Sequence, residues 1–268
     1  MTEQFSEISA ALETWYRGER GAYLLSRLQA SLDARLDTAF GYHILQTGPV
    51  QCGPLFGECR IHHRIRASEQ GGTDIGLVCA GDELPLESDS VDVIIAHHAL
   101  EFSPNPHQVL RELHRVLTPQ GQLFLTGWNP YSGSGLLQRL RALAPRSPWR
   151  EQSPVSVRRL TDWLNLLGCE VESTSYHYHL APAGQGRLRA ALEGLNDWCA
   201  QVGLPMGGIY LVHAIKQVGA SQRPRLARRR ERFIGLGVTS PVSSPGATTG
   251  LTQAGKTASR KKSGPVLH

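Results

Sequence analysis

Two acidic residues follow an apolar run in the first half of the sequence and could bind a polar ligand. Asp82 and Glu83 come directly after "IGLVCAG", residues 75–81, which is typical of a strand that ends at a glycine. The carboxylate of Asp82 can accept a hydrogen bond from an exocyclic amine, and Leu84 offers an apolar wall to a ring. The alternative is that Asp82 only caps a turn before Leu84.

Two histidines end the next apolar run, "VDVIIAHH", residues 91–98. One of the two imidazoles, of His97 or of His98, could act as a general base near neutral pH, although histidines at strand ends more often pack or face solvent. In an open parallel sheet the ligand binds outside the carboxyl ends of the strands. We therefore expect both histidines near Asp82, and we assign no catalytic residue.

The elements that would position these residues follow from the spacing of apolar side chains. Short apolar or alternating runs predict strands at residues 42–47, 60–67, 75–80, 91–97, 122–128, 169–180 and 208–217. Helical spacing predicts helices at residues 8–18, 23–40, 105–121, 156–168 and 187–203, with the first two broken near Gly18 and Gly21. Strand, helix and strand in succession imply a right-handed parallel crossover. The fold class is therefore α/β, with a doubly wound Rossmann-like sheet.

Charge and cysteine content indicate an unsecreted protein with a basic tail. The chain carries +5, but residues 219–268 hold ten basic residues and one acid, so the first 218 residues carry −4. The tail is rich in Gly, Ser, Thr and Pro, which predicts disorder. The five cysteines are scattered without a C-x-x-C pair, and no apolar run is long enough to span a membrane. We expect a cytoplasmic protein without integral membrane association.

A fifty-residue pattern resembles one known family. The segment "GDELPLESDSVDVIIAHHALEFSPNPHQVLRELHRVLTPQGQLFLTGWNP", residues 81–130, has an acid before Leu-Pro, then Ser-Val-Asp before a strand, a helix with Arg-Glu and Arg-Val-Leu-x-Pro, and a glycine before a strand. It closely resembles the second half of the cofactor-binding core of class I S-adenosylmethionine-dependent methyltransferases of the type 11 kind. The later elements fit that family's final antiparallel strand pair. The resemblance covers residues 41–217, and it also extends to a poorly characterised bacterial group with an altered first motif.

The resemblance implies a cofactor, a reaction and a set of binding residues. S-adenosylmethionine would be the methyl donor, and the acceptor would be an unidentified small molecule. The implied cofactor-binding residues are Gly48, Gly53, Asp82, Glu83, Leu84, His97 and His98. Asp82 would lie at the adenine. No metal is implied, because the histidine pairs of the sequence have no second ligand cluster with suitable spacing.

The turn after the first predicted strand departs from the family's pattern. In this family the strand normally ends in an acid and a G-x-G-x-G turn, but here Gln46 stands in the place of the acid, and prolines flank Gly48 and Gly53. Glu69 is a late candidate for the acid that binds ribose. Only 36 residues separate Gln46 from Asp82, which leaves hardly any room for two crossover helices. We expect the first of them to be absent or replaced by a loop or hairpin.

Two other functions remain open at this point. The protein could be a catalytically inactive binding or scaffold protein whose basic tail contacts nucleic acid or an anionic membrane surface, or the tail could simply be solvated. It could also bind an altered form of the cofactor. The domain organisation that we predict is an N-terminal helical lid at residues 1–40, a methyltransferase-like α/β domain at 41–217 and a disordered basic tail at 218–268.

Overall fold

The computed structural model describes residues 2–49, 53–57, 59–72, 74–136, 152–180 and 186–218, and all of them belong to one compact unit, Met1–Arg223. The helices in this part of the chain are α1 (Thr2–Arg17), α2 (Glu19–Leu36), α3 (Pro106–Val116), α5 (Val157–Leu166) and α6 (Arg187–Val202). The strands are β1 (His43–Thr47), β2 (His63–Ser68), β3 (Leu77–Val78), β4 (Val91–His97), β5 (Leu117–Trp128), β6 (Cys169–His177) and β7 (Ile209–Lys216).

The strands form one seven-stranded sheet in the order β3-β2-β1-β4-β5-β7-β6. Pairs from β3 through β5 are parallel, whereas β7 runs antiparallel to both β5 and β6. The order reverses between β1 and β4, so the loops after β1 and β4 diverge there and leave a crevice at the carboxyl ends. The predicted doubly wound sheet with a final antiparallel pair is confirmed.

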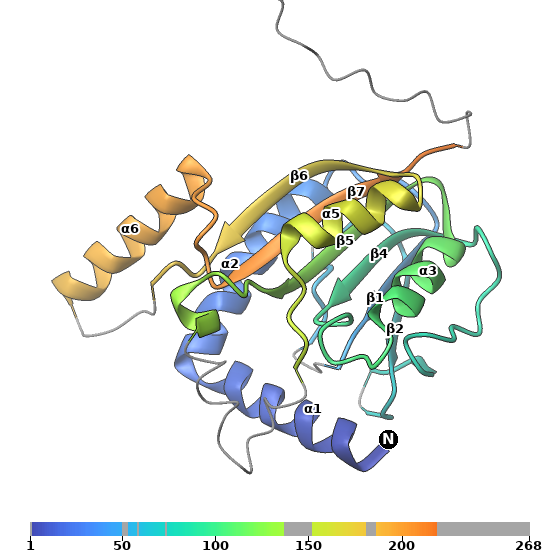
Figure 1. The fold of residues 1–268 in the computed structure, drawn as a ribbon, viewed down its shortest axis with the longest axis horizontal. Helices are drawn as coiled ribbons and strands as arrows, with labels where there is room; N and C mark the ends of the chain where they lie inside the picture. Colours follow the sequence, from blue (N-terminus) through green and yellow to red (C-terminus); the bar gives the residue numbers. More distant parts are fainter. Residues whose placement is uncertain are drawn as a thin grey trace, which may run out of the picture. The chain divides into compact units, whose positions relative to one another are not determined.

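Helices cover the sheet on both faces, as Figure 1 shows for α3 and α5 on one side and α2 on the other. The periodic apolar residues of α3, Val109, Leu110, Leu113 and Val116, pack with Leu160 and Leu164 of α5 against the sheet. On the opposite face, α2 buries Leu28, Leu32 and Leu36 against β1, β4 and β5. The two hydrophobic clusters therefore hold the strand ends in place from both sides.

The connection between β1 and β2 contains no helix among its described residues. Instead, Leu55, Phe56, Cys59 and Ile61 of this connection insert into the cluster that α2 forms with the sheet. The short chain length predicts that the first crossover helix is absent or replaced by a loop or hairpin. Among the described residues, α2 and this loop together cover that face of the sheet.

Several predicted boundaries were wrong by a few residues. The third strand is limited to Leu77–Val78 rather than residues 75–80, because it forms only two pairs with the end of β2. The first helix breaks only at Gly18, whereas Gly21 lies inside α2. Two helix ends behave as expected: Gly168 and Gly203 adopt φ of +82° and +72°, a conformation that ends helices and that glycine adopts without strain.

The predicted basic tail lies outside the described residues apart from Val218. The assignment of residues 1–40 as a lid, and the other domain boundaries, stay predictions. Within the part of the chain that the structure describes, no helix is long and apolar enough to cross a membrane.

Candidate ligand-binding site at the carboxyl ends of the strands

A pocket opens at the carboxyl ends of β1 to β4. It encloses about 560 Å³ of empty space, a volume that includes the solvent at its open mouth. Its walls come from the residues that follow each strand and from the start of α3: residues 47–49, 68–69, 79–82, 99, 102–104 and 109. The pocket is therefore built where the strand order predicts a ligand site.

Two carboxylates meet at this pocket, Glu69 after β2 and Asp82 after β3. Partial burial raises the pKa of Glu69, and the neighbouring charge of Asp82 raises this pKa further, while a hydrogen bond from the backbone N–H of Gly81 opposes the shift. Both carboxylates can accept hydrogen bonds from donors on a ligand. The pair is suited to hydroxyl or amino groups.

The structure brings together only some of the residues implied by the sequence. Gly48 and Asp82 line the pocket. Glu83 is exposed and borders a neighbouring groove that Asp82 also lines, and the side chain of Leu84 lies in the hydrophobic core with 3% exposure. Gly53 does not line the pocket either. The binding roles of these residues stay predictions.

Gln46 holds the connection after β1 against the strand. Its Nε2 donates to the carbonyl of Gly53 at 3.0 Å, and its Oε1 accepts from the backbone N–H of Leu55 at 2.7 Å. With 4% exposure, this amide is buried, and it satisfies one donor and one acceptor of the loop. A carboxylate in the same place could serve only the N–H. Gln46 therefore organises the turn after β1.

Gly48 is required by the close approach of two strand ends. Its φ is +142°, and a Cβ on this residue would collide with the backbone carbonyl oxygen of His97. The glycine allows the turn after β1 to lie directly beside the end of β4. Next to it, the carbonyl of Pro49 accepts a hydrogen bond of 2.6 Å from Ser9 Oγ, so α1 reaches the rim of the pocket.

His97 and His98 lie behind the pocket wall rather than in it, with 1% and 0% exposure. His97 Nδ1 lies 2.6 Å from Thr126 Oγ1, and its Nε2 is buried without a hydrogen-bond partner in the described part of the chain. Burial, and then the neighbouring His98, hold the pKa of His97 well below its usual value. His97 is therefore neutral at physiological pH.

His98 belongs to a buried polar network that sequence reasoning missed. Its Nε2 lies 2.7 Å from Tyr16 Oη of α1, and its Nδ1 lies 3.1 Å from Glu101 Oε2. Glu101 also accepts from the backbone N–H of Trp128 and, at 3.2 Å, from Gln152 Nε2. Burial lowers the pKa of His98 to about 3 and raises the pKa of Glu101 to about 8. The network is therefore uncharged near neutral pH, and it joins α1, the turn after β4, β5 and the segment before α5.

Among the described residues, no group of three or more His, Cys, Asp or Glu side chains is arranged to hold a metal ion.

Residues 61–125 match the family described as "Methyltransferase domain". The chain is 32% identical over 155 residues to the uncharacterized protein YafS of Escherichia coli K12, which covers 58% of this chain and 63% of that protein. It is 28% identical over 169 residues to trans-aconitate 2-methyltransferase of Escherichia fergusonii, covering 55% of this chain and 66% of that protein. Both matches span less than two thirds of the relatives' length.

A solved structure from Thermotoga maritima shares the fold. This S-adenosylmethionine-dependent methyltransferase, described as a possible histamine N-methyltransferase, has a TM-score of 0.55 and 16% sequence identity, and the match covers 81% of this chain and 100% of that chain.

Proposed function

We propose that the chain is a class I S-adenosylmethionine-dependent methyltransferase, which transfers a methyl group from S-adenosylmethionine to a small-molecule acceptor. The match of residues 61–125 to a methyltransferase domain and the fold shared with a solved methyltransferase support this proposal. The observation that carries this proposal is the pocket at the carboxyl ends of β1 to β4, which Gly48, Glu69 and Asp82 line. A relative named for methylation of trans-aconitate supports a small molecule as the acceptor class.

The residues of the pocket fit the nucleoside part of the cofactor. Asp82 can accept from the exocyclic amine of adenine, and Glu69 can accept from the ribose hydroxyls. The raised pKa of Glu69 supports this role, because donors on a ligand would offset the repulsion between the two acids. Val109 and Phe102 supply apolar walls. Gly48 brings the backbone of the β1 turn close to the pocket without a side chain between them.

Methyl transfer of this kind does not require a charged dyad. The cofactor supplies an electrophilic methyl group on a sulfonium, and the protein contributes in-line positioning and exclusion of water. His97 and His98 are buried behind the wall and engaged with Thr126 and Tyr16, so we assign them a supporting role rather than contact with the acceptor. The turn that follows them, at Ala99 and Phe102, forms the wall itself.

The proposal is tested by isothermal titration of the protein with S-adenosylmethionine and with S-adenosylhomocysteine, together with thermal melting at saturating ligand. We expect micromolar binding and a rise in Tm, since ligand at 100 times Kd stabilises by about 2.7 kcal/mol. Asp82→Ala should weaken binding at least about tenfold, the equivalent of roughly one lost hydrogen bond. Asp162→Ala, an exposed acid on α5, is the matched control and should bind like the wild type.

Two outcomes would contradict the proposal. Absence of binding up to millimolar ligand would exclude S-adenosylmethionine as the cofactor. Unchanged binding by Asp82→Ala together with a lower Tm would show that Asp82 only caps its turn.

A further inference from the structure

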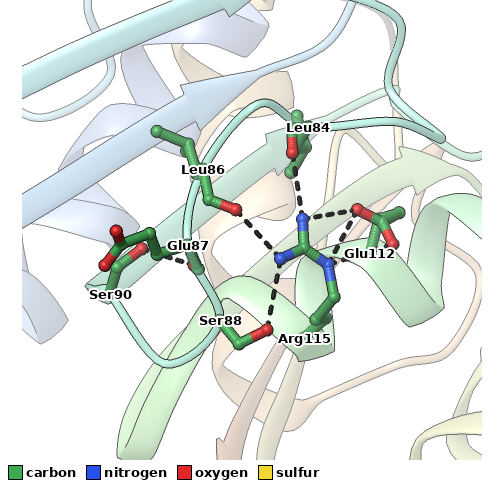
Figure 2. A network of polar contacts seen from close by, with 7 residues as sticks. All are labelled: Leu84, Leu86, Glu87, Ser88, Ser90, Glu112 and Arg115. Carbon is green, nitrogen blue, oxygen red and sulfur yellow. Dashed lines mark hydrogen bonds and ion pairs between the residues drawn. The ribbon is translucent and has the colours of Figure 1, made fainter.

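Arg115 of α3 fastens the loop that carries Asp82. Figure 2 shows its guanidinium surrounded by backbone carbonyls of this loop: Nη2 donates to Leu84 O at 2.9 Å and Nη1 donates to Leu86 O at 2.9 Å. Nη1 also lies 3.3 Å from Ser88 Oγ. One side chain thus holds three positions along five consecutive residues. Arginine is suited to this task because its planar group presents several donors in fixed directions.

Glu112, one turn earlier on α3, orients the guanidinium and adds a fourth attachment. Its carboxylate accepts from Arg115 Nη2 at 2.8 Å and from Nε at 3.1 Å (Figure 2). It also accepts a hydrogen bond from the backbone N–H of Leu84, and these hydrogen bonds, that from Arg115 first, lower the pKa of Glu112. Both backbone groups of Leu84 are therefore held by α3.

The loop has little regular structure of its own to fix its position. β3 ends at Val78 and β4 begins at Val91, and no helix or strand lies between them. The Leu84 side chain is anchored in the core, and Val109 at the start of α3 lines the pocket close to Gly81. Asp82 lies between Gly81 and Leu84, two places where α3 touches the loop. The contacts of α3 with Leu84 therefore help to set where Asp82 lies at the pocket.

We propose that Arg115, with Glu112, is a positioning residue for the cofactor: it sets the place of the Asp82 loop, and so the cofactor affinity, without lining the pocket described above. The inference rests on the proposed function, because it concerns the same pocket. The arginine of the Arg-Val-Leu pattern at the end of α3 would thus contribute to ligand binding. The pair is partly exposed, with 35% and 15% side-chain exposure, so the ion pair alone would contribute little, and the carbonyl contacts carry the effect.

The test compares Arg115→Ala and Arg115→Lys with Arg111→Ala as the matched control, an exposed arginine one turn earlier on the same helix. S-adenosylhomocysteine is the probe, and titration calorimetry gives its Kd for the full-length protein. We expect Arg115→Ala to raise Kd at least about tenfold, the size of one to two lost hydrogen bonds. Arg115→Lys should recover part of this loss, because an ammonium can reach one carbonyl but not both. Arg111→Ala should stay within about twofold of the wild type.

Hydrogen exchange of the peptide spanning residues 81–90 provides a second measurement, which a general loss of stability would not mimic. Arg115→Ala should speed exchange in this peptide and leave peptides of β5 and β7 unchanged. An unchanged Kd in Arg115→Ala, with or without a lower Tm, would overturn the positioning role. If the wild type binds and Asp82→Ala weakens binding while Arg115→Ala does not, only this inference fails. If the wild type does not bind the probe at all, the proposed function fails and the positioning role fails with it.

Discussion

The Glu101 side chain is only 1% exposed, and acidic side chains are rarely buried to this extent. Its pKa of about 8, raised by burial, means that it is largely protonated near neutral pH, and its Oε2 can then donate to His98 Nδ1. The groups that face it are His98, Tyr210, Gln152 and the backbone N–H of Trp128. None of these is a fixed cation, so a charge on Glu101 would be poorly compensated.

Replacing Glu101 with Gln should therefore remove a pH dependence of stability. Between pH 4.5 and about 8 the folded wild type keeps the Glu101 proton, whereas the unfolded chain has released it. The raised pKa therefore adds to the free energy of unfolding. This stabilisation is fully present below pH 4.5 and is lost as pH rises through about 8. Gln mimics the protonated acid and cannot ionise. We expect the difference in free energy of unfolding, Glu101→Gln minus wild type, to increase by roughly 1 kcal/mol for each pH unit between these two pKa values.

Urea denaturation of both proteins at several pH values from 5.5 to 8.5 checks this expectation. A difference between the two proteins that does not change with pH would show that Glu101 is already ionised in the folded state. The downward shift of the pKa of His98 has the opposite sign, because it favours folding as pH rises, but it is common to both proteins and largely cancels in the comparison.

The crossing of α1 and α2 depends on one glycine. Gly21 lies in the first turn of α2, and a Cβ there would collide with the backbone of Trp15 and Tyr16 in α1. Those two residues tie α1 to the rest of the molecule, since the Trp15 ring packs edge-on against Trp128 at 5.1 Å and Tyr16 bonds to His98. The close approach at Gly21 thus sets where α1 lies relative to the pocket rim.

Gly21→Ala should destabilise the protein by about 1–3 kcal/mol, because the overlap with backbone cannot be relieved by a side-chain rotation. Gly194→Ala is the matched control, since Gly194 lies inside α6 with open space around it. There the better helix propensity of Ala should stabilise by up to about 1 kcal/mol. Thermal melts of the two variants should shift in opposite directions, and a shift in the same direction would contradict a tight crossing at Gly21.

In the molecule as a whole, α2 serves as a permanent layer of the core. Leu28, Leu32 and Leu36 are fully buried against the sheet, beside a β1–β2 connection whose described residues form no helix. Burial of this kind is not compatible with a helix that detaches when ligand enters.

Leu32→Ala should accordingly cost about 2–5 kcal/mol of unfolding free energy, as expected for a large-to-small change in a packed core. Leu166→Ala, at a leucine on α5 with 79% exposure, is the matched control and should change stability by less than about 0.5 kcal/mol. Denaturant titration measures both. A small effect of Leu32→Ala would mean that α2 is only loosely attached to the sheet.

The order of residues along the chain is sufficient to predict the elements and the sheet class, because periodicity and helix-ending glycines act over neighbouring residues. The spacing of Val109, Leu113 and Val116 predicts α3. The short stretch of chain from Gln46 to Asp82 predicts that a crossover helix is absent or replaced there. Asp82 could be placed at the ligand edge for the same reason, since it directly follows a predicted strand.

The sequence could not predict which side chains at that edge face the pocket. His97 and His98 turn into the core, and Gln46 turns toward Leu55, because strand register and loop packing decide these directions. The contacts that define the site join distant residues: Tyr16 and His98 are 82 positions apart, and Arg115 and Leu84 are 31 apart. Such contacts depend on how the helices pack on the sheet, and that packing is a property of the folded chain alone.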